Sequence, residues 1–145
     1  MGAWGYESYS NDDCFDALAN GQIKGKKYRD NHLNIYKMNQ KECNQAVSKT
    51  HKNLEDKTDY RDKTAFVGVV IWVLIDGKKV SKKYLTLALK MAKDLIYYCG
   101  NYCNPDERAK FLKTEIKAIE SALAGHGTAT LERGKSLIEQ FADLI

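Results

Sequence analysis

The apolar positions of the chain repeat mostly every three or four residues, which is the spacing of a helix with one buried face. The repeat is clearest over residues 81–99 and 104–123. The second segment opens with Asn104-Pro105 and is followed by Gly125, the usual start and stop signals of a helix. We predict both segments to be helices, with inner faces formed by Leu85, Ala88, Leu89, Ala92, Leu95, Ile96 and Cys99 in the first, and Ala109, Leu112, Ile116, Ile119 and Leu123 in the second.

A third segment, residues 62–76, is apolar on all sides. Its β-branched residues and the Asp76-Gly77 pair that follows are also typical of a hairpin. The run is long for a strand, however, and one hairpin alone makes a poor sheet. We therefore predict a central buried helix that ends at Gly77, with Trp72 in the core and Gly68 allowing a neighbouring helix to approach closely.

Weaker patterns predict a short helix over residues 11–19, a mostly polar helix over 32–55 with one thin apolar stripe, and a last helix from about residue 130. Together these segments predict an all-α fold, an irregular bundle of about five to six helices in a single domain, 1–145. The alternative is an α+β fold with a hairpin around Asp76-Gly77.

The opening segment contains a tryptophan, several aromatic side chains and a dense acidic patch. Large apolar side chains near a terminus usually fix it to the core, so we expect Trp4 and Tyr9 to be buried. Asn11 is a good N-cap, and acids fit the first turn of the helix it would start. Asp13 is expected to be exposed.

The same segment resembles the N-terminal signature of an uncharacterised family, domain of unknown function 4259, whose members commonly open in a form like MGAWGxGPFxNDDAxDWL. Tyr9 stands where the family has Phe, and Glu7 and Ser8 depart from its usual Gly-Pro. The resemblance covers residues 1–19 and implies a small, mostly helical domain without assigned activity. It depends on Gly2, Trp4, Gly5, Asn11, Asp12 and Asp16.

The net charge is +4, but it is unevenly spread, with an acidic opening and basic stretches in the middle of the chain. No signal peptide is recognisable, and the longest apolar run, residues 65–75, is far shorter than the ~20 residues that a membrane helix needs. We therefore expect no membrane partner and an intracellular, cytoplasmic protein. Its four cysteines should be reduced there.

Candidate chemistry is sparse. Asp12 and Asp16, four residues apart and next to Asp13, would share a helix face and could bind a cation, although a capped helix start with solvated acids explains them better. The spacing of Cys99 and Cys103 fits zinc poorly. The histidines are expected at the surface, and only His126, in a glycine loop, is a weak site candidate. No catalytic motif is present, so we predict no cofactor and no metal, and lean against an enzyme.

Two basic stretches, 24–29 and 78–83, are candidate nucleic-acid contacts, although solvated loops are the simpler interpretation. Their basic residues are Lys24, Lys26, Lys27, Arg29, Lys78, Lys79, Lys82 and Lys83. The first functional hypothesis is a protein-interaction or regulatory module with a protein partner. Nucleic-acid binding through these stretches is the second, and an enzyme or metal binder using the acids of the first helix is the third.

Overall fold

A computed structural model describes residues 8, 9, 14, 16, 18, 38–54 and 59–125 of the chain. These residues are mostly helical and include no strand, so the predicted all-α fold is confirmed and the α+β alternative is wrong for this part of the chain. The elements are α3 (Gln40–Asn53), α4 (Tyr60–Ile75), α5 (Lys82–Leu95), the 3-10 helix η2 (Ile96–Asn101) and α6 (Pro105–Leu123).

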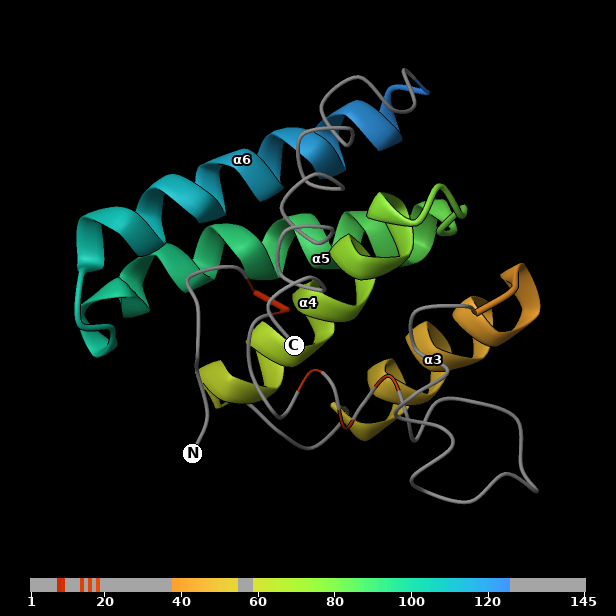
Figure 1. The fold of residues 1–145 in the computed structure, drawn as a ribbon. Helices are drawn as coiled ribbons and strands as arrows, with labels where there is room; N and C mark the ends of the chain where they lie inside the picture. The colour runs from red at the N-terminus through yellow and green to blue at the C-terminus, as the bar shows by residue number, and fades with distance from the viewer. Residues whose placement is uncertain are drawn as a thin grey trace, which may run out of the picture.

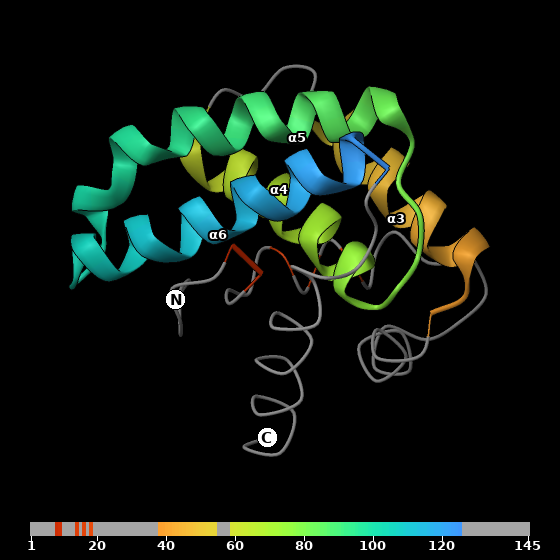
Figure 2. The ribbon, with the colours of Figure 1, turned by 90° about the horizontal axis from the view of Figure 1, so that it is seen from above.

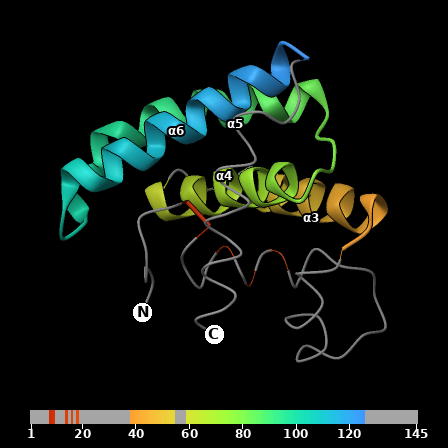
Figure 3. The same cartoon turned by 45° about the horizontal axis from the view of Figure 1, so that its top comes forward.

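The helices form two layers. Figures 1 and 3 show α5 and α6 side by side over a second layer that contains α4 and α3. Figure 2 shows that α6 returns alongside α5 after the turn at η2. The short links force successive helices to run antiparallel, as in other helical bundles.

The centre of the core is α4, as the sequence predicts. Every residue from Thr64 to Ile75 is buried, including Trp72. The helix ends in the manner of a glycine C-cap, because Gly77 has a φ of +78° and its N–H donates to the carbonyl of Leu74 at 3.0 Å. Asp76-Gly77 therefore closes a helix, and the hairpin interpretation fails because the glycine is used for this left-handed cap.

Side-chain caps fix where the helices begin. Asn39 accepts from the N–H of Glu42, whose carboxylate accepts in turn from the N–H of Asn39, so α3 starts with a complete capping box. The prediction of one helix over 32–55 was wrong at its beginning, because Met38 and Asn39 are not helical. The start of α6 was predicted correctly, with Asn104 accepting from the N–H of Glu107.

The helix predicted over 81–99 is shorter than expected. The α-helix ends at Leu95 and continues as η2, and Ile96, assigned to the inner face, is 39% exposed. Aromatic residues and glycine favour the helix less than the Leu, Ala and Lys that precede them, which fits a tighter and less regular turn over Ile96–Asn101. The other predicted inner positions are at least half buried: Leu85, Ala88, Leu89, Ala92, Leu95 and Cys99.

Some predictions fall outside the part of the chain that the structure describes. These include the positions of Trp4, Asn11 and Asp13 and the last helix from about residue 130. In the expected first helix, Cys14, Asp16 and Leu18 are helical. Four α-helices are described, so the predicted count of five to six is not supported.

Candidate functional site

Three polar side chains meet in the interior, although the chain separates Ser8 from the other two by about a hundred residues. Ser8, Arg108 and Glu115 are all buried. The Ser8 hydroxyl donates to Glu115 Oε1 at 2.7 Å and accepts from an Arg108 guanidinium nitrogen at 3.0 Å. The Ser8 backbone N–H donates to Glu115 Oε2 at 3.0 Å, and Arg108 lies 3.5 Å from Glu115 Oε1. We call these three residues the buried polar cluster.

Helix geometry explains the meeting. Arg108 and Glu115 lie two turns apart on α6, so both side chains project from the face that also carries Leu112 and Ile119. A buried charge is tolerated only when it is paired and hydrogen-bonded. Sequence reasoning missed this cluster. The sequence pattern that could have indicated it is a pair of oppositely charged residues seven positions apart, Arg108 and Glu115, with Leu112 between them.

Tyr102 lies against the cluster. The Arg108 guanidinium carbon lies 5.0 Å from the centre of the Tyr102 ring, within the range of a cation–π contact. Burial raises the pKa of the Tyr102 hydroxyl, while the charge of Arg108 opposes the shift and that of Glu115 adds to it. Tyr102 is therefore a neutral phenol at neutral pH, packed beside a paired arginine.

The opening segment is also fixed to α4. Tyr9 is buried, as predicted, and its ring meets Trp72 edge to face at 5.6 Å. At Gly68 a β-carbon would clash with the Ser8 carbonyl oxygen and approach the Cys14 sulfur to 2.7 Å. Gly68 was predicted to let a neighbouring helix approach closely. The nearest atoms belong to Ser8, which lies in a turn, and to Cys14, which is helical.

The cysteines are free thiols, and only Cys103 is exposed. Burial raises the pKa of Cys99, whose sulfur donates to the Leu95 carbonyl. Cys99 is therefore a buried, protonated thiol that packs as a small apolar side chain, as predicted. Among the described residues, no three His, Cys, Asp or Glu side chains lie close enough together to hold a metal ion.

The acidic site candidates are only partly located. Asp16 is half buried, while Asp12, Asp13 and His126 lie outside the described residues. His51, expected at the surface, is instead half buried between two aromatic rings, 6.0 Å from Phe66 and 5.2 Å from Tyr84. His51 lies four residues after the buried Val47, on the side of α3 that the predicted apolar stripe marks, so helical spacing could have indicated its position.

The basic candidates divide into two groups. Those of the first stretch, Lys24, Lys26, Lys27 and Arg29, lie outside the described residues. In the second stretch, Lys78 pairs with Asp76 at 3.9 Å, and the backbone of Lys79 exchanges hydrogen bonds with the side chain of Gln40. Lys82 and Lys83 are exposed in the first turn of α5.

Large apolar side chains are exposed at η2. Tyr97 is 87% exposed, and Ile96 and Tyr98 are each more than a third exposed. Tyr98 stacks on Tyr60 with ring centres 5.4 Å apart and an angle of 13° between the rings. We call Ile96, Tyr97 and Tyr98 the η2 ledge.

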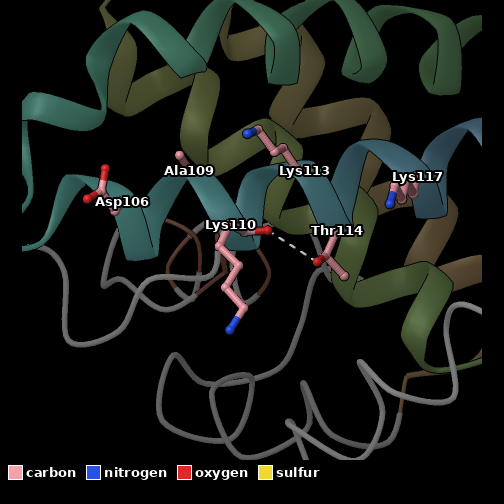
Figure 4. Close-up of a pocket in the computed structure, with 6 residues that line it drawn as sticks. All are labelled: Asp106, Ala109, Lys110, Lys113, Thr114 and Lys117. Atoms are coloured by element: carbon pink, nitrogen blue, oxygen red, sulfur yellow. Dashed lines mark hydrogen bonds between the residues drawn. The ribbon is translucent and has the colours of Figure 1, made fainter.

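A shallow hollow of about 430 Å³ lies on the outer side of α6 (Figure 4). Its described lining comes from this one helix, and the Thr114 hydroxyl is already used, because it donates to the Lys110 carbonyl at 3.2 Å. All the polar residues of this described lining are exposed. The hollow is lined by Asp106, Ala109, Lys110, Lys113, Thr114 and Lys117.

Comparison with known proteins adds no function: no protein-family model, no curated protein and no solved structure matches the chain. The resemblance of residues 1–19 to the uncharacterised family stays a prediction. None of the described helices is long and apolar enough to span a membrane.

Proposed function

We propose that the chain is a small non-enzymatic interaction module that binds a protein partner through the η2 ledge. The observation that carries the proposal is the exposure of Tyr97, at 87%, beside two other exposed large side chains on the same short helix. Adjacent exposed apolar side chains favour a contact surface, whereas single ones are ordinary. In this proposal the chain is one intracellular domain whose thiols stay reduced.

The chemistry of the ledge suits recognition. Tyrosine presents a large ring and a polar tip with few rotatable bonds, and it is over-represented among the residues that dominate binding energies. The stacking of Tyr98 on Tyr60 holds one of the two rings in place before a partner arrives. A pre-positioned ring loses less conformational entropy on binding.

The interior groups of the described residues are used within the fold. The buried polar cluster joins its three members by internal hydrogen bonds, and all three residues are buried. Cys43 and Cys99 are buried and their pKa values are raised, so neither is a thiolate at neutral pH.

A photo-crosslinking experiment tests the proposal. Tyr97 is replaced by the photoreactive residue p-benzoylphenylalanine in the full chain, which is expressed at native abundance in its own cells. Ser48, exposed on α3, receives the same group as a matched control. We expect one discrete protein adduct from position 97 and none from position 48.

Companion variants locate the contact. Adding Ile96→Ser and Tyr98→Ser to the position-97 probe should reduce the adduct about tenfold, because the apolar area around the probe is lost. Identical adduct patterns from positions 97 and 48, or an adduct unaffected by these two changes, would refute binding through the η2 ledge.

A further inference from the structure

The outer face of α5 carries four lysines that no carboxylate of the described residues neutralises: Lys82, Lys83, Lys90 and Lys93. All four are exposed, and the repeat of 3.6 residues per turn places them, together with Thr86, along one side of the helix. We call these residues the α5 lysine face.

The neighbouring acid does not cancel this charge. Asp94 is the one acidic residue of α5, and it pairs with Lys63 of α4 at 3.8 Å. Lys78, within the α4–α5 link, pairs with Asp76. The basic surface thus differs from the stretch 78–83 expected from the sequence. The first half of that stretch is partly neutralised, and the exposed basic residues continue along α5 instead.

We propose that the α5 lysine face binds single-stranded nucleic acid through its phosphates. Lysines clustered along one helix are the electrostatic feature of a nucleic-acid-binding surface. From Lys82 to Lys93 the helix rises about 16 Å, which is long enough to follow several consecutive phosphates of one strand. The four lysines lie outside the η2 ledge, and Tyr97 of the ledge takes part in both proposed contacts.

An exposed aromatic side chain follows the α5 lysine face along the chain. Tyr97 comes four residues after Lys93 and is the most exposed of the large hydrophobic side chains in the described part of the chain. Single-strand binders combine a basic track with aromatic rings on which unpaired bases stack. A duplex offers no unpaired base to such a ring, so the arrangement favours a single strand.

Fluorescence anisotropy with a 5′-fluorescein-labelled, mixed-sequence 20-nucleotide DNA tests this on the full chain. Lys82→Gln, Lys83→Gln, Lys90→Gln and Lys93→Gln are combined in one variant. The matched control removes the same charge from four other exposed lysines: Lys41, Lys52, Lys110 and Lys117. Far-UV circular dichroism checks that both variants keep the helical content of the wild type.

We expect wild-type affinity to fall with salt with a log–log slope of about −3, the value for four contacts on a single strand. The α5 variant should bind at least tenfold more weakly at low salt, and the control less than threefold. Equal losses in the two variants would overturn the proposal, because net charge alone would then explain the binding. Undetectable wild-type binding at low salt would overturn it as well.

Substitutions at Tyr97 distinguish binding of nucleic acid from binding of any other polyanion. Tyr97→Ala should weaken binding about tenfold, whereas Tyr97→Phe, which keeps the ring, should stay within twofold. If poly-glutamate competes as well as unlabelled DNA and Tyr97→Ala has no effect, the face serves an acidic protein and the nucleic-acid proposal is wrong. The quadruple lysine variant should still form the photo-adduct from position 97, so the two proposals fail independently.

Discussion

At the scale of single residues, the most consequential feature is an ion pair that water does not reach. Desolvation of Arg108 and Glu115 offsets much of their attraction, so the pair contributes little compared with an apolar replacement of the same shape. Removing one partner is different, because it leaves the other charge buried without compensation, at about 3–5 kcal/mol. Ser8 satisfies both charged groups at once.

Cys43 makes stability depend on pH. Burial, helped by the negative charge of Asp76, raises its pKa from 9.0 to about 11. The folded chain therefore holds this proton more tightly than the unfolded chain. The resulting stability is fully present below pH 9 and is lost as the pH rises through about 11. A difference of this size corresponds to about 2–3 kcal/mol.

Cys43→Ala removes this dependence. Urea unfolding of wild type and variant at pH 8 and pH 11 should show the wild type losing about 2–3 kcal/mol relative to the variant as the pH rises. A difference between the two proteins that stays constant over this range would show that the folded and unfolded chains hold the Cys43 proton equally.

The burial of single residues was predicted well for apolar side chains and poorly for polar ones. Trp72, Tyr9 and Cys99 are buried as their types and spacing indicated. Arg108 and Glu115 were missed because charged residues are almost never fully buried unless paired, and the third partner, Ser8, is remote in sequence. Spacing within α6 can suggest the pair, but it cannot supply Ser8.

At the scale of elements, the caps define the helices. Asn39→Ala should cost about 1 kcal/mol, because it removes the acceptor for the Glu42 N–H and disrupts the capping box. Ser81→Ala is the matched control. Ser81 occupies the N-cap of α5, but its side chain makes no cap hydrogen bond, so the change should lower the free energy of unfolding by only a few tenths of a kcal/mol. Urea unfolding compares them, and equal costs would contradict the assigned caps.

The contact at Gly68 gives a second element-scale prediction. Alanine normally favours a helix over glycine by about 1 kcal/mol. At Gly68 the added methyl group would meet the Ser8 carbonyl oxygen and the Cys14 sulfur, so Gly68→Ala should instead destabilise by about 1–3 kcal/mol. Gly100→Ala, with no atom within 4 Å of the new carbon, is the control. Stabilisation by Gly68→Ala in thermal unfolding would contradict this packing.

The elements themselves were predictable in proportion to the strength of their end signals. Asn104-Pro105 and Gly125 marked both ends of α6, and Gly77 marked the end of α4. Helix α3 starts at Gln40 because an asparagine cap overrides an apolar stripe that continues before it. The change from α5 to η2 fits the weaker helix propensity of Ile96–Asn101, but no cap residue or proline marks the point where it occurs.

At the scale of the whole molecule, the opening segment is a structural arm. Ser8 joins it to α6 and lies against Gly68 of α4, while Tyr9 packs on Trp72. These contacts connect Ser8 to Glu115 across 107 residues of sequence. The surfaces proposed for binding lie elsewhere, on α5 and η2. In this account the described part of the opening segment stabilises the fold, because it joins α4 to α6.

A double-mutant cycle at Ser8 and Glu115 tests this account most directly. The free energy of unfolding in urea is measured for the wild type, Ser8→Ala, Glu115→Gln and the double variant. If the arm is fixed through the buried polar cluster, the two changes are coupled, and the double variant should lose about 1–3 kcal/mol less than the sum of the single losses. Losses that add within about 0.5 kcal/mol would show that Ser8 does not hold the arm to α6, and would contradict the account.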